Sequence, residues 1–75
     1  MQDRQIKKIL IRNNIDFKKL NLKHQECERK LEELHSGSIK TEKEWREEQN
    51  LKKKKLKLKD LMQKYILEYR KQVIH

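Results

Sequence analysis

Two residues near the middle of this chain have side chains that can bind a metal ion or act as a nucleophile, His24 and Cys27. They stand three positions apart, so on a helix they share one face and can supply two ligands to zinc. A closed structural zinc site needs four ligands, and the sequence has no second pair at a matching spacing. Catalysis by the Cys27 thiol would need a neighbour that stabilises the thiolate and access for a substrate, and an apolar helix face offers neither. We therefore predict no metal, no cofactor, no small-molecule substrate and no enzymatic activity, with Cys27 buried and His24 hydrogen-bonded to an acidic neighbour.

The segment 51–60 carries lysine at six of its ten positions and invites a nucleic-acid interpretation. Successive helical residues are turned by about 100°, so these lysines surround the helix instead of forming one basic face. We favour a solvated face, and we expect any nucleic-acid binding to be nonspecific, because the aromatic residues that could stack on bases fall on the apolar face. Two coherent basic stripes do arise on the outer faces of the predicted helices, and these are the candidates for polyanion contact: Arg12, Lys19, Lys23, Lys30, Lys53, Lys57, Lys64 and Lys71.

The composition places these residues on helices. The 75 residues contain no proline and a single glycine, and 44% of them are charged, so we predict one small all-α domain, residues 1–75. Asn14 has the side chain of a helix N-cap, Gly37 can close a helix, and Thr41 begins a capping box with Glu44. These signals predict a short helix over 3–12, a main helix over 14–35, a turn over 36–41 and a second long helix over 42–72. Whether the short helix continues into the main one is left open.

Apolar residues at heptad spacing give each long helix one face to bury, which we call the seam. The short turn makes the helices antiparallel neighbours, so the predicted fold is a coiled-coil-like two-helix hairpin with a short N-terminal helical extension. The expected register places Leu34 beside Trp45 and Phe17 beside Met62, with the charged end of Glu48 reaching water. Glu28 is expected to meet Lys52 or Lys55. The predicted seam consists of Leu10, Phe17, Leu20, His24, Cys27, Leu31 and Leu34, facing Leu51, Leu58, Met62, Tyr65, Ile66, Tyr69 and Val73.

A second set of apolar residues lies away from the seam, where a solitary hairpin would expose it. We expect this set to associate with a second copy of the chain or with another helical protein, a marginal monomer being the remaining alternative. Charge is also uneven: residues 26–48 carry eight acidic and five basic side chains, a net charge of −3, and the rest of the chain carries +12. Such a dipolar rod can bind polyanions or pair with a copy in the opposite orientation. The predicted interaction stripe is Ile11, Ile15, Leu22, Trp45, Leu56, Leu67 and Ile74.

Two motifs resemble those of the YdcH-like family, small bacterial helical-hairpin proteins. The first has Phe17, Leu20, His24, Cys27, Glu28 and Leu31 at the family's spacing, and the second has Leu51, Lys52, Lys55, Leu56, Leu58, Lys59 and Asp60. The chain departs from the family pattern at Ile15, at Cys27 and at Leu61, where members carry Pro, Leu and an acidic residue. The resemblance implies a helical hairpin with no known catalytic activity, and it implies no function for this chain.

The predicted location is the cytoplasm. The chain has no run approaching the roughly 20 apolar residues that span a bilayer, its N-terminal segment lacks the apolar region of a secretory signal, and one cysteine cannot form an internal disulfide. We therefore predict no membrane insertion. The preferred function is a non-enzymatic interaction module that self-associates or binds a protein partner, and the alternative is sequence-nonspecific polyanion binding.

Overall fold

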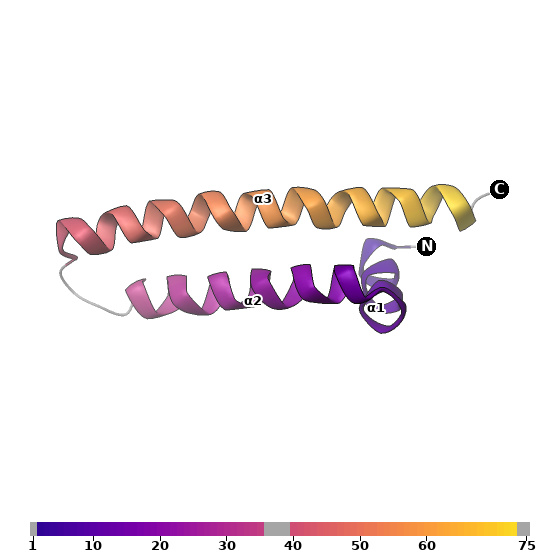
Figure 1. The fold of residues 1–75 in the computed structure, drawn as a ribbon, viewed down its shortest axis with the longest axis horizontal. Coiled ribbons are helices and arrows are strands. Elements are labelled where there is room, and N and C mark those ends of the chain that lie inside the picture. The colour runs from indigo at the N-terminus through magenta and orange to yellow at the C-terminus, as the bar shows by residue number, and fades with distance from the viewer. Residues whose placement is uncertain (1, 36–39, 74–75) are drawn as a thin grey trace.

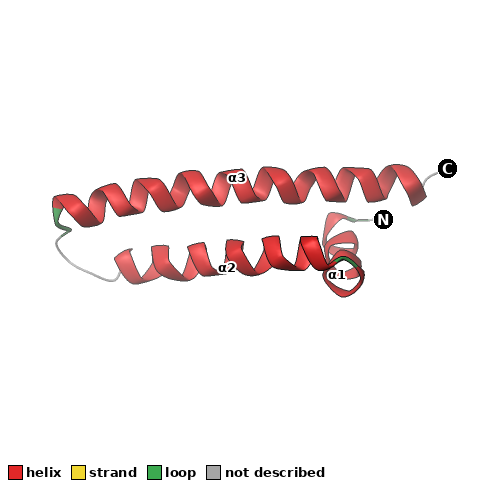
Figure 2. Cartoon of the chain, in the orientation of Figure 1, coloured by secondary structure: helices red, strands yellow, loops and turns green. Residues whose placement is uncertain are grey.

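The computed structural model describes residues 2–35 and 40–73, and these form three helices: α1 (Asp3–Asn13), α2 (Ile15–His35) and α3 (Glu42–Val73). Helices α2 and α3 lie side by side and run in opposite directions, and α1 lies across the end of the pair that is far from the α2–α3 connection (Figure 1). The described residues outside these helices are short connections (Figure 2). The molecule is a rod with extents of 52 × 20 × 17 Å. The all-α prediction is confirmed; the turn predicted around Gly37 falls on residues 36–39, outside the described part.

Asn14 separates α1 from α2, which answers the question that the sequence left open. Its backbone is extended, with φ −128° and ψ 109°, and its amide donates to the carbonyl of Leu10 at 2.8 Å. Its side-chain Oδ1 accepts a hydrogen bond from the amide of Phe17 at 3.0 Å, so Asn14 caps α2 as predicted. At the start of α3 the Thr41 hydroxyl likewise accepts from the amide of Glu44 at 3.2 Å, which confirms that part of the predicted capping box. The chain can therefore turn sharply after α1 while both helix ends keep their hydrogen bonds.

The core consists of two clusters of buried side chains along the rod. The cluster at the open end draws on all three helices, because Ile6 and Leu10 of α1 pack with side chains of α2 and α3. A two-helix hairpin with an extension is therefore only roughly right, since α1 is a third packing element. Leu20 is half-buried and packs against both clusters. The open-end cluster is Ile6, Leu10, Phe17, Met62 and Ile66, and the cluster nearer the connection is Cys27, Leu31, Leu51 and Leu58.

The register of α2 against α3 differs from the predicted one by about one helical turn. Phe17 makes an edge-to-face ring contact with Tyr65, with centroids 6.0 Å apart, and Glu28 pairs with Lys55 at 3.4 Å. Tyr65 lies three residues further along α3 than Met62, the residue predicted beside Phe17. The shift leaves Trp45 exposed instead of packed on Leu34, and it leaves Val73, predicted to lie on the seam, exposed at the end of α3. The predicted contact of Glu28 with Lys55 is confirmed.

Candidate functional site

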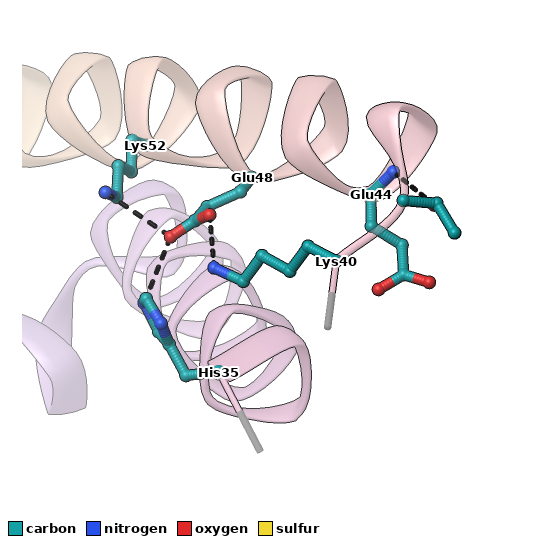
Figure 3. Close-up of polar contacts among 6 residues, drawn as sticks. His35, Lys40, Glu44, Glu48 and Lys52 are labelled. Carbon is teal, nitrogen blue, oxygen red and sulfur yellow. Dashed lines mark hydrogen bonds and ion pairs between the residues drawn. The ribbon is translucent and has the colours of Figure 1, made fainter. Parts of the chain in front are cut away.

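The most elaborate polar site of the described residues surrounds Glu48, near the connection between α2 and α3. This side chain points from α3 toward the end of α2 (Figure 3). Its Oε2 lies 2.5 Å from Nζ of Lys40, and its Oε1 lies 3.2 Å from Nε2 of His35 and 3.4 Å from Nζ of Lys52. The carboxylate thus joins the last residue of α2, the segment before α3 and α3 itself. The prediction that its charged end reaches water is wrong, because Glu48 is only 4% exposed.

The electrostatics of Glu48 follow from this arrangement. The hydrogen bond from Lys40 lowers the pKa of the carboxyl group most strongly, burial opposes that effect, and the Lys52 ammonium lowers the pKa further. The net effect lowers the pKa, so the ionised form is favoured in the folded protein. A buried carboxylate held by two ammonium groups and an imidazole is a structural clasp with no free face for a substrate. We therefore assign this site to holding the end of α2 and Lys40 against α3.

His24 and Cys27, the predicted candidates for chemistry, do not form a common site. Cys27 is buried in the cluster nearer the connection, as predicted. The Nδ1 atom of His24 lies 3.7 Å from Oε1 of Glu28, which is longer than a hydrogen bond, and its buried Nε2 atom has no hydrogen-bond partner among the described residues. In residues 2–35 and 40–73 no group of three or more His, Cys, Asp or Glu side chains is placed to hold a metal ion.

A hollow of about 280 Å³ opens beside His24, where the three helices meet. Lys7 of α1 lines it, together with Lys55 and Lys59 of α3 and Glu28 of α2. Burial is the main cause that lowers the pKa of His24; Glu28 raises it, and Lys55, Lys7 and Lys59 lower it. The three ammonium groups therefore act on one half-buried imidazole. The sequence did not predict this site, because Lys7 reaches it only through the way α1 packs.

The predicted interaction stripe is exposed in most of its residues and is divided between α2 and α3. Ile15 and Leu22 are exposed on α2, whereas Trp45, Leu56 and Leu67 are exposed on α3. Ile11, predicted to belong to the stripe, is instead half-buried against the open-end cluster, because α1 packs as part of the core. Ile74 lies outside the described residues. The largest exposed apolar set is therefore on α3.

The predicted polyanion contacts are all exposed, four on α1 and α2 and four on α3: Arg12, Lys19, Lys23, Lys30, Lys53, Lys57, Lys64 and Lys71. Lys30 pairs with Glu26 at 3.4 Å, an i,i+4 contact at the surface. Exposure is equally expected of a solvated face and of a face that contacts a polyanion. The geometry of these side chains therefore does not choose between the two interpretations.

Asn21 is a buried polar residue that the sequence interpretation missed. It is 6% exposed, and its Oδ1 atom has no hydrogen-bond partner within the described residues. The available signal was its spacing, four residues after Phe17 and three before His24, which puts it on the buried side of α2. A polar residue at such a position commonly fixes register at a cost in stability.

None of the helices in the described residues has the length and apolarity needed to cross a bilayer. Comparisons of the chain with protein-family models, with curated proteins and with solved structures found no match.

Proposed function

We propose that the chain is a non-enzymatic protein-interaction module that pairs with a second copy of itself through the exposed face of α3. The observation that carries this proposal is the arrangement of Trp45, Leu56 and Leu67. These three exposed apolar side chains are spaced 11 residues apart, which is close to three helical turns, so they lie in one row along α3. We place the protein in the cytoplasm and in the YdcH-like family, on the single cysteine and on the two motifs described above.

The residues on the two sides of Leu56 correspond to each other: at equal distances from Leu56 lie two apolar residues, two glutamines or two residues of opposite charge. A two-fold axis at Leu56 sets the two α3 helices antiparallel, and each residue then faces the partner's residue at the same distance beyond Leu56. Trp45 of one copy faces Leu67 of the other, and apolar contacts form on both sides of the axis. The full row, which we call the α3 row, is Glu42, Trp45, Gln49, Lys52, Leu56, Asp60, Gln63, Leu67 and Arg70.

Charges in the α3 row agree with the antiparallel pairing. Lys52 faces Asp60 of the second copy, and Glu42 faces Arg70, so each pair has opposite signs and occurs twice in the dimer. Lys52 also lies 3.4 Å from Glu48, and Glu42 and Arg70 have exposed partners within the chain, namely Arg46 and Asp3. Replacing such an exposed ion pair within the chain by one between the two copies changes the free energy little, because each exposed pair contributes about 0 to 1 kcal/mol. The ion pairs therefore select the register, and the apolar side chains supply most of the affinity.

The size of the contact sets the expected strength. The α3 row spans 29 residues, or about 42 Å of helix, but it is only one side chain to two side chains wide. A contact of that shape falls at the low end of the area that specific complexes bury, so we expect a dimer that dissociates in the micromolar range.

Trp45 is the one tryptophan of the chain and reports on this contact directly. Its fluorescence should shift to shorter wavelength as the protein concentration rises, because Leu67 of the partner covers the ring, and sedimentation velocity should show the dimer over the same range. Leu56→Glu places two like charges on the two-fold axis and should give a monomer with full helix content. Leu22→Glu is the matched control, since Leu22 is equally exposed but lies on α2.

A cysteine at the axis tests the antiparallel register. Leu56→Cys should form a disulfide between the two copies under mild oxidation. A disulfide requires Cβ atoms about 3.5 to 4.5 Å apart, and only a residue on the two-fold axis lies that close to the same residue of the second copy. Disulfide formation through the native cysteine should be low, since Cys27 is buried. Leu22→Cys should remain reduced. A wild-type protein that is monomeric at every concentration, with Trp45 unshifted, refutes the self-association and leaves the α3 row as a docking face for another helical protein.

The second candidate function is nonspecific polyanion binding, for which all eight basic residues of the two stripes are exposed and accessible. Contacts of this kind release counterions. The logarithm of the affinity for nucleic acid should therefore fall steeply and linearly with the logarithm of the salt concentration. Nucleic acid that co-purifies at low salt and leaves at high salt supports this function. Dimerisation through the α3 row should change little over the same salt range, because apolar burial is not screened.

A further inference from the structure

We propose that the hollow at the junction of α1, α2 and α3 binds a phosphate group, held by Lys7, Lys55 and Lys59. The site is separate from the α3 row, and the proposal does not rest on self-association. The source of the group is either free phosphate or the phosphate of a small organic molecule.

Three observations on the hollow favour an anion. Its walls carry three lysines against one carboxylate, and that carboxylate, Glu28, is paired with Lys55 at 3.4 Å. Lys7 and Lys59 have no such counter-charge from the walls, so the hollow has an excess of two positive charges with His24 neutral. Gln63 adds an amide that can donate a hydrogen bond. Like charges gathered around one hollow repel one another, and a phosphate group removes that repulsion.

His24 gives the hollow a polar floor. Its Nε2 atom is buried and has no hydrogen-bond partner in the part of the chain that the structure describes, which is uncommon for a buried polar atom. A bound phosphate can accept a hydrogen bond from a protonated imidazole or donate one to a neutral ring. His24 is thus a group that gains a partner when an anion enters.

The dimensions restrict the ligand. A volume of about 280 Å³ is near the lower limit for sites that hold drug-sized molecules, so the hollow accommodates a phosphate group but not a nucleotide as a whole. Three ammonium groups from two different helices also surround a compact anion better than an extended polymer, whose charges follow one line. The hollow therefore differs in kind from the two exposed basic stripes.

The test uses nuclear magnetic resonance of the His24 ring, identified by its loss in His24→Gln. Inorganic phosphate is added to the whole chain at constant ionic strength maintained with sodium chloride. We expect a saturable shift of the His24 signals and a rise in the pKa of His24, because the anion offsets the lysines that surround the ring. Lys7→Gln and Lys59→Gln should each weaken phosphate binding about tenfold, which is the effect of losing one hydrogen bond to a charged group.

Lys64→Gln is the matched control, because Lys64 is an exposed lysine of the same helix outside the hollow. It should leave the affinity within about twofold, as expected for a distant surface charge. A shift that never saturates, or equal weakening by Lys59→Gln and Lys64→Gln, overturns the proposal in favour of general screening. Glycerol phosphate serves as the second ligand: tighter binding than inorganic phosphate identifies an organic phosphate as the source, and weaker binding identifies the free ion. Circular dichroism of each variant confirms that the helices remain formed.

Discussion

Two leucines on one helix provide a direct test of the packing described above. Leu58 is 7% exposed in the cluster nearer the connection, whereas Leu56, two residues earlier on α3, is 61% exposed. Removing the side chain of a buried leucine loses its transfer free energy and leaves a cavity, which together cost about 2 to 5 kcal/mol. Leu58→Ala should fall near the middle of that range, because the surrounding cluster is small and can partly relax.

The effect is large relative to the whole protein. A chain of 75 residues is expected to have a free energy of unfolding of about 4 to 11 kcal/mol. A loss of about 3 kcal/mol corresponds to a fall in Tm of roughly 12 to 24 °C for a domain of this size. Urea denaturation, monitored by circular dichroism, measures the change in the free energy of unfolding. Trimethylamine N-oxide can stabilise the variant enough for its folded baseline to be recorded.

Leu56→Ala is the control, since it removes the same atoms from the same helix. At concentrations where the protein is monomeric it should change the free energy of unfolding by less than about 0.5 kcal/mol, as surface substitutions do. Equal losses for the two variants would refute the assignment of Leu58 to the core. A larger loss for Leu56→Ala would mean that α3 is rotated about its axis relative to α2.

The remaining predictions concern the helix boundary and pH. Asn14→Ala should reduce the free energy of unfolding by about 1 kcal/mol, measured in urea, because the amide of Phe17 loses its capping partner. The lowered pKa of Glu48 means that its stabilisation is present above the ordinary value of 4.5 and is lost as the pH falls below it; Glu48→Gln should remove this loss from the urea midpoints. The pKa of His24 is lowered as well, so the neutral ring is favoured on folding, and stability should fall as the pH drops below the ordinary value of 6.5; a His24→Gln variant that retains the full pH dependence would contradict this.

Local signals explain how much of the fold could be predicted from the sequence. The caps at Asn14 and Thr41 depend on hydrogen bonds within four residues, so side-chain type alone identifies them. The buried sides of α2 and α3 follow from apolar spacing, which does not depend on how the helices meet. Helices 14–35 and 42–72 were predicted, and the structure has Ile15–His35 and Glu42–Val73.

Features that depend on how segments meet could not be predicted in this way. Apolar spacing alone does not fix the register of α2 against α3, because heptads allow a shift of one turn after which equivalent side chains again face each other. The burial of Glu48 depends on polar partners from three segments, His35, Lys40 and Lys52, and the usual rule places a lone glutamate in water. The direction of α1 is decided by the extended backbone of Asn14, and this direction brings Lys7 to the hollow.

The two proposed sites share α3, and this allows them to be coupled. Lys59 lines the hollow, and in the antiparallel dimer centred on Leu56 it lies at the edge of the contact, at the same height along the rod as Lys53 of the second copy. The dimer therefore brings like charges together on both sides of its axis, and phosphate in the hollow reduces this repulsion. Because linkage is reciprocal, phosphate should tighten the dimer by the same factor by which dimerisation tightens phosphate binding.

Sedimentation velocity in phosphate and in sodium chloride of equal ionic strength measures this coupling. The wild-type dimer should be tighter in phosphate, because sodium chloride screens both charges but binds neither copy. Lys59→Gln should tighten the dimer in sodium chloride and abolish the difference between the two buffers, since it removes both the repulsion and one phosphate contact. Lys64→Gln should preserve the difference. If phosphate instead dissociates the wild-type dimer, the anion and the partner compete for the same lysines, and either the hollow or the register of the α3 row is wrongly assigned.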